Sequence, residues 1–211
     1  MTSWLGRLFR RAPSGDPAAL KAFLAGQAAF VAQKTVVDYC RVKAGRSEQK
    51  MFADPDFNAA LLHCRWQTFA ATVQDVTALA EAWLRPQAAG QEATLGSALA
   101  QLGAAILDEA PAPAEERASL DAARDGLPWV IVALQATPPS SADRMLLRAE
   151  QPLLATLPVH PDQRIGETVA IRGALRFHVV TTQQEMERMF LPAPLCRALL
   201  ESHLDRDEVS T

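Results

Sequence analysis

The longest regular pattern in this sequence is a run of apolar residues at helical spacing that begins just after Asp16. Asp16 is a good N-cap, and Pro17 occupies the first helical position, where a missing N–H costs nothing. The spacing predicts a helix that continues to about Ala44 and ends at Gly45. Its apolar positions are Leu20, Phe23, Leu24, Phe30, Val31 and Val37.

A second long helix follows, and it starts with the same pair of residue types at Asp54 and Pro55. It is expected to end at Arg85, because Pro86 cannot continue a helix. Only the short polar connection 45–53 separates the two helices. They are therefore predicted to fold back on each other as a long antiparallel hairpin.

A third apolar ridge at 92–109 completes a predicted bundle that spans 16–110. Two prolines then interrupt the chain, so 114–211 are expected to form a smaller part that packs on the bundle. An N-terminal segment and linker, 1–15, precede it. The sequence thus predicts a mainly α fold, a helical bundle organised on the long antiparallel hairpin.

The first half of the C-terminal part has a mixed pattern. Residues 115–124 predict a short polar helix, and the Asp-Gly-Leu-Pro sequence at 125–128 predicts a turn. The nearly all-apolar stretch 129–136 fits either a buried strand or a buried helix, because periodicity does not separate the two. A serine at 140 or 141 is expected to cap another helix, which Pro152 would kink or end.

The one convincing strand pattern lies at 168–180, where Gly173 interrupts an alternation of apolar and polar residues. The alternating apolar residues are Val169, Ile171, Leu175, Phe177 and Val179. The pattern predicts a small hairpin or a bulged strand, so the C-terminal part is expected to contain one or two short β-strands. A threonine at 181 or 182 would then cap a helix, and 195–204 would form a last short one.

Four charged residues of the hairpin fall inside its apolar arcs on a helical wheel: Lys34, Asp38, Arg41 and Arg65. An isolated buried charge is very costly, so these side chains need partners or water. The spacings of Lys34 to Asp38 and of Asp38 to Arg41 allow ion pairs along one helix. Because the four are net cationic, they form a candidate site for a carboxylate, a phosphate or a partner.

The same charges also have a purely structural interpretation. Arginine and lysine can bury their stems and keep their charged heads in water. Asp108 and Glu109 of the third helix can also supply acidic partners. The sequence leaves both interpretations open.

The first eleven residues have a basic amphipathic pattern. On a helix, one side would carry Trp4, Leu5, Leu8 and Phe9, and the other side would carry Arg7, Arg10 and Arg11. This pattern is typical of contact with a membrane surface, and so short a segment would order only on contact. Docking on the protein's own body, insertion into a partner's groove and absence of fixed structure are the alternatives.

Composition narrows the class of protein. The 211 residues are 49% hydrophobic and carry a net charge of -3, which is typical of a soluble globular protein. The mildly acidic balance argues against a nucleic-acid partner. No segment is apolar enough to span a membrane, and no secretory signal occurs, so we expect a cytoplasmic protein. Its N-terminal segment offers a means of association with the inner face of a membrane. The three cysteines, Cys40, Cys64 and Cys196, are expected to be free and buried.

The sequence contains no short catalytic motif. The patterns GxGxxG, GxxxxGK[ST], GxSxG and HExxH are all absent. Cys40, Cys64 and His63 lack an identifiable fourth ligand, so we predict no metal site. No catalytic residue and no cofactor are indicated, which favours a binding protein over an enzyme.

The leading prediction is therefore a cytoplasmic, non-catalytic binding or assembly protein whose hairpin charges hold a protein partner or an anionic ligand. One alternative is a helical protein or enzyme that binds an amphipathic anionic small molecule in the hairpin core, with Asp38 as an acid–base group. Another is an oligomeric scaffold that makes contact through the third helix. The sequence leaves the oligomeric state open.

Overall fold

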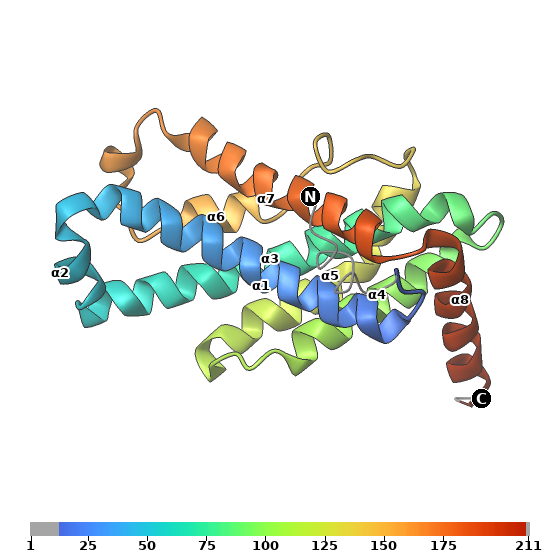
Figure 1. Ribbon diagram of the computed structural model, residues 1–211. Helices are drawn as coiled ribbons and strands as arrows, with labels where there is room; N and C mark the ends of the chain where they lie inside the picture. Colours follow the sequence, from blue (N-terminus) through green and yellow to red (C-terminus); the bar gives the residue numbers. More distant parts are fainter. Residues whose placement is uncertain (1–12, 210–211) are drawn as a thin grey trace, which may run out of the picture.

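The computed structural model describes residues 13–209, with side chains described as far as Leu204, and this part of the chain is mainly helical (Figure 1). The α-helices are α1 (Pro17–Ala44), α2 (Glu48–Phe52), α3 (Pro55–Leu84), α4 (Glu92–Glu109), α5 (Arg117–Gln135), α6 (Glu150–Thr156), α7 (Thr168–Met189) and α8 (Pro192–Val209). Short 3₁₀ turns lie at Gly45–Ser47, Arg85–Gln87, Ala114–Glu116 and Pro161–Arg164. Within 13–209 the β structure consists of one isolated bridge, between Ser14 and Phe190.

The predicted hairpin is formed by α1 and α3, with α2 in the connection between them (Figure 1). The Asp16 carboxylate accepts a hydrogen bond from the backbone N–H of Ala18 at 2.9 Å, and Asp54 accepts one from Phe57 at 2.9 Å. Both N-caps are therefore confirmed. Helix α1 ends where Gly45 takes a φ of 50°, which glycine adopts without steric cost.

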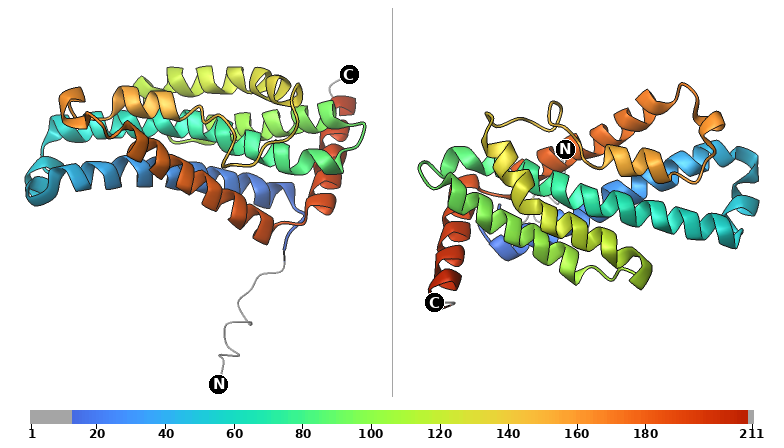
Figure 2. Two further views of the ribbon diagram at one scale, coloured as in Figure 1. Left: turned by 90° about the horizontal axis from the view of Figure 1, so that it is seen from above. Right: turned by 180° about the vertical axis from the view of Figure 1, so that it is seen from behind.

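The central element of the fold is α3. It packs against α1, α4, α5 and α6, and its residues 75–82 are all buried. Helices α4 and α5 form a second antiparallel pair, α7 lies along α1, and α8 crosses the end of the bundle near the start of α1 (Figure 2). A helix surrounded in this way has few positions open to water, so the buried polar residues in its second half, Asp75, Thr77 and Glu81, need hydrogen-bond partners within the protein.

The strand predicted at 168–180 is wrong, because this segment is the first part of α7. The buried residues of α7 recur every three or four positions and are Ile171, Leu175, Val179, Thr182 and Met186. Val169 and Phe177 completed the apparent alternation, but they lie on the outer side of the helix, 78% and 67% exposed. Thr182 is consequently an interior residue of the helix and not a cap.

Helix α5 corrects two further predictions. It runs without a break through the expected turn at 125–128 and the apolar stretch 129–136, and it carries Pro128 in its interior. The turn does not form because Leu127, in the middle of it, is fully buried in the core. The stretch after it is a helix but is not wholly buried, since the Trp129 side chain is 77% exposed.

The helix expected from Ser140 or Ser141 does not form, since 136–149 consists of turns and irregular backbone. Helix α6 begins later, and Pro152 lies in its first turn, where a missing N–H costs little. The last helix starts at Pro192, ahead of the predicted start at Leu195.

Candidate functional site

Three of the four hairpin charges lie on the outer side of α1. Lys34 Nζ is 2.8 Å from Asp38 Oδ2, as their spacing predicts, and both side chains are nearly half exposed. Arg41 turns toward α2, where its Nε lies 3.1 Å from Glu48 Oε1, and it does not pair with Asp38. These side chains therefore reach water instead of the hairpin core, as long polar side chains do at the edge of a packed face.

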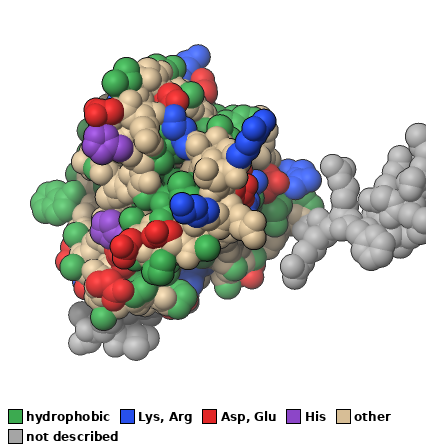
Figure 3. Space-filling view, turned by 90° about the vertical axis from the view of Figure 1, so that its left-hand side faces the viewer, with side chains coloured by type: hydrophobic (Ala, Val, Ile, Leu, Met, Phe, Trp, Pro, Cys, Tyr) green, Lys and Arg blue, Asp and Glu red, His purple; other side chains and the backbone are tan. Residues whose placement is uncertain are grey.

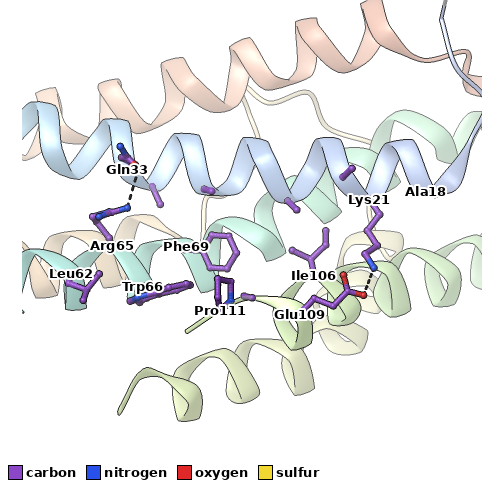
Figure 4. A pocket seen from close by; sticks show the side chains of 15 residues that line it. Ala18, Lys21, Gln33, Leu62, Arg65, Trp66, Phe69, Ile106, Glu109 and Pro111 are labelled. Carbon is purple, nitrogen blue, oxygen red and sulfur yellow. Dashed lines mark hydrogen bonds and ion pairs between the residues drawn. The ribbon is translucent and has the colours of Figure 1, made fainter. Parts of the chain in front are cut away.

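The fourth charge, Arg65, projects from α3 and borders a different groove from the one lined by Lys34, Asp38 and Arg41. The groove beside Arg65 runs along α1, between α1, α3 and the C-terminal end of α4 (Figure 4). Its volume is about 550 Å³, within the usual range for small-molecule sites. The lining residues are Ala18, Lys21, Ala22, Ala25, Ala29, Ala32, Gln33, Leu62, Arg65, Trp66, Phe69, Ile106, Glu109, Ala110 and Pro111.

The α1 wall of the groove is made of alanines. They occur at positions 18, 22, 25, 29 and 32, and this alternation of four and three residues keeps them on one side of the helix. Most of them are exposed or only partly buried. A wall of methyl groups is smooth and apolar, and it lets another group come close to the helix backbone.

The opposite wall carries larger apolar side chains. Leu62, Trp66 and Phe69 project from α3 at spacings of four and three, and Trp66 and Phe69 meet edge to face with ring centroids 5.5 Å apart. Ile106 and Pro111 complete the wall at the end of α4 (Figure 4). The groove is thus lined mainly by apolar groups from three segments that are distant in the sequence.

The two ends of the groove differ in charge. At one end Lys21 Nζ contacts Glu109 Oε1, so the two charges compensate each other. At the other end Arg65 Nη2 donates to the neutral amide oxygen of Gln33 at 3.1 Å. Among the side chains that the structure describes, no carboxylate lies within salt-bridge distance of Arg65. The Nε atom of Arg65 and the Nε1 atom of Trp66 are buried without a hydrogen-bond partner.

Sequence reasoning found part of this groove. It singled out Arg65, and it named Glu109 as an acidic partner for a hairpin charge, although the partner is Lys21 and not one of the four predicted residues. It missed the apolar walls. The spacing of the alanines on α1 was the available signal, but alanine is common throughout this chain and did not stand out.

Asp75 is a fully buried acid that lies outside the groove and has a structural role. Its carboxylate accepts hydrogen bonds from the backbone N–H groups of Arg148 and Ala149, at 2.8 and 3.0 Å. These contacts fix the irregular segment that leads into α6. Complete burial raises the pKa of Asp75 to about 7, and the two backbone donors oppose part of that rise.

Glu81 is also fully buried. Its carboxylate forms a two-pronged ion pair with Arg85, at 2.8 and 2.7 Å, and accepts a third hydrogen bond from Gln135 at 2.9 Å. Arg85 also donates to the backbone oxygens of Leu134 and Thr137 at the end of α5. This network ties the end of α3 to the end of α5.

The cysteines have the properties expected of structural thiols. Cys40, Cys64 and Cys196 are free and buried, as predicted. Burial raises the pKa of Cys40 to about 12 and also raises the pKa of Cys64 and Cys196, so all three stay protonated at neutral pH. Among the described side chains, no group of His, Cys, Asp and Glu is arranged to hold a metal ion.

The surface at the α2 end of the molecule mixes both signs of charge with hydrophobic side chains (Figure 3). Two ion pairs near this end are Arg41 with Glu48 and Lys43 with Glu167, at 3.1 and 2.8 Å. Such mixing differs from the single-sign patch that binds nucleic-acid phosphates. The predicted membrane or partner contacts, 4–11, lie outside the described residues.

No protein-family model, curated protein or solved structure was found to match this chain. None of the helices in the described part is long and apolar enough to cross a membrane. Function must therefore be argued from the groove itself.

Proposed function

We propose that this protein binds an amphipathic anion, of the long-chain carboxylate type, in the groove between α1, α3 and α4. One observation carries the proposal: Arg65, a cation with no acidic partner among the described side chains, stands at the end of an apolar groove. The sequence had left several kinds of binding open, and this arrangement favours an anionic small molecule with an apolar tail.

The carboxylate of the ligand is placed at Arg65. A guanidinium has five N–H donors in a fixed fork that matches a carboxylate. Only Nη2 of Arg65 has a described hydrogen bond, and its acceptor is an amide that an anion can displace. A charge-assisted hydrogen bond contributes about 1.5–3 kcal/mol, which corresponds to a ten- to hundredfold effect on affinity.

The tail of the ligand is placed along the alanine wall of α1, opposite Trp66 and Phe69. Each methylene that leaves water there contributes about 0.8 kcal/mol before the entropic cost of binding. At the far end Lys21 is already neutralised by Glu109. The groove therefore suits a molecule with one charged end, and an uncharged tail end would lie beside this ion pair.

The first test is to titrate the purified 211-residue chain with laurate and to measure the affinity by isothermal titration calorimetry. Laurate should bind and dodecanol should bind at least tenfold more weakly, since only laurate can pair with Arg65. The variant Arg65→Leu should weaken laurate ten- to hundredfold. Arg41→Leu is the matched control, because Arg41 has the same charge but lies outside the groove, and it should leave the affinity unchanged.

A second pair of variants tests the position of the tail. Ala25→Phe puts a ring into the groove and should abolish laurate binding, whereas Val42→Phe, at a highly exposed position of the same helix, should not. If Arg65→Leu and Ala25→Phe both bound laurate as strongly as the parent chain, the proposed site would be contradicted. Circular dichroism of each variant confirms that the helical fold is intact.

A further inference from the structure

We infer, on the basis of the proposed use of the groove, that residues 1–12 of the same chain dock in it and that the amphipathic anion must displace them. The N-terminal segment would then regulate the site. This inference joins the amphipathic pattern of residues 1–11 to a groove that the described residues leave open.

The segment is tethered close to the groove. Ser14 N donates to Met189 O at 2.8 Å, and Leu191 N donates to Ser14 O at 2.9 Å, so the chain just after residue 12 is held at the junction of α7 and α8. Helix α1 begins at Pro17, and the first residue that lines the groove is Ala18. Only the few residues between Pro13 and Ala18 therefore separate the segment from the near end of the groove.

The groove is long enough to hold residues 1–12 as a helix. Twelve residues in a helix span about 18 Å, and α1 covers about 22 Å between Ala18 and Gln33, the first and last groove residues on that helix. The segment is too short to be a stable helix alone, so contact must stabilise it. An apolar groove walled by α1 and α3 is the kind of surface on which an amphipathic helix docks.

The side chains are complementary as well. Trp4, Leu5, Leu8 and Phe9 would fall on one side of a helix, and large apolar side chains fit against a wall of alanine methyl groups. A segment that folds back antiparallel to α1 brings Arg10 and Arg11 to the near end of the groove. There the carboxylate of Glu109 is 64% exposed despite its contact with Lys21.

Arg65 explains why an anion displaces the segment. In the antiparallel arrangement, residues 1–4 reach the far end of the groove, and none of them has an acidic side chain. The docked segment therefore leaves Arg65 without an anionic partner. A carboxylate ligand competes for the same apolar surface and supplies that partner in addition.

Tethering makes even a weak contact effective. A short flexible linker gives an effective concentration on the order of 1 mM, so a segment with a Kd near 0.1 mM as a free peptide would occupy the groove about 90% of the time. Its removal from the groove should then tighten ligand binding about tenfold.

The experiment measures laurate affinity by calorimetry in three versions of the 211-residue chain: the parent and two double variants. Leu5→Asp/Leu8→Asp destroys the apolar side of the segment and should bind laurate about tenfold more tightly than the parent chain. Ser3→Asp/Gly6→Asp adds the same charge on the other side and should match the parent. Equal affinity in all three proteins, or an equal shift in both variants, would overturn the inference.

A direct binding measurement separates this inference from the proposed function. A fluorescent peptide of residues 1–15 should bind the Leu5→Asp/Leu8→Asp protein, lose binding when Ala25→Phe is added, and keep it with Val42→Phe. Failure of the peptide to bind, or binding that survives Ala25→Phe, would overturn the inference even if laurate binds. Peptide binding without laurate binding would overturn the proposed function alone.

Sedimentation of the parent chain tests whether docking occurs within one molecule. A monomer is expected. A dimer that Leu5→Asp/Leu8→Asp dissociates would place the segment in the groove of a second copy, and the assignment to the same chain would be wrong.

Discussion

Asp75 and Glu81 are two fully buried acids on one helix, and the protein accommodates them in different ways. Asp75 forms no ion pair with a described side chain and accepts hydrogen bonds from two backbone N–H groups. Burial raises its pKa to about 7, although these donors and the charges of Arg148 and Arg176 oppose part of the rise. Glu81 has Arg85 against it and an amide donor as well. A buried charge needs either such partners or a proton, and the two residues illustrate both outcomes.

The raised pKa of Asp75 predicts a specific dependence of stability on pH. The folded state holds this proton up to about pH 7, whereas a free aspartate loses it near 3.8. The group therefore contributes its full stabilisation below about pH 4, and that contribution is lost as the pH rises through 7. Each unit of pKa shift corresponds to about 1.4 kcal/mol.

The variant Asp75→Asn removes the titration and keeps one hydrogen-bond acceptor. Urea unfolding of both proteins between pH 4 and 8 should show the parent losing stability relative to the variant as the pH rises, with a plateau above about 7. A difference that stays constant over this range would contradict the assignment. The other carboxylates titrate in both proteins, so their effect cancels in the difference between the two free energies of unfolding.

The Glu81–Arg85 pair predicts a large loss of stability when one partner is removed. Glu81→Gln leaves the Arg85 charge in a nearly buried position and should cost about 3–5 kcal/mol. The control is Glu48→Gln, which breaks an exposed pair with Arg41 and should cost less than about 1 kcal/mol. Similar losses in urea unfolding for the two variants would argue against a buried network.

At the scale of elements, the long helices could be predicted because each has its own signals. Asp16 and Asp54 are the N-caps of α1 and α3, and a proline follows each of them. The apolar spacing is helical over 28 residues in α1 and 30 in α3, so a few charged residues within it do not change the prediction. Helix α7 could not be predicted in the same way. Exposed apolar residues such as Phe177 lie between its buried positions and produce the alternation of apolar and polar residues that is typical of a strand. The pattern of a strand and that of a partly apolar helix coincide over so short a window.

A matched pair of truncations in α7 checks this correction. In the helix, Leu175 is completely buried whereas Phe177 is mostly exposed, although a strand would place both on the same face. Leu175→Ala should therefore destabilise the protein by about 2–5 kcal/mol, and Phe177→Ala should change its stability by less than about 0.5 kcal/mol. Comparable losses in thermal unfolding would favour a strand.

At the scale of the whole molecule, the groove could not be predicted because it depends on how three helices meet. The sequence shows that Arg65 falls within the apolar arc of its helix. It does not show that Arg65 has no acidic partner among the described side chains, because that depends on the tertiary packing. The α4 wall comes from residues some forty positions further along the chain, and their approach is set by packing on α3. Lys34, Asp38 and Arg41 seemed equivalent to Arg65 on a helical wheel, and only the tertiary arrangement separates them.

The position of α7 along α1 has a consequence for the order in which the protein is made. Phe23 of α1 packs edge-on against Phe190, the residue that follows α7, with ring centroids 5.5 Å apart. Residues 85–167 must be synthesised after α3 before α7 begins, which takes roughly 4 to 17 seconds at typical rates of translation. Until then the side of α1 that α7 covers stays exposed, and apolar surface exposed during synthesis in this way is prone to aggregation.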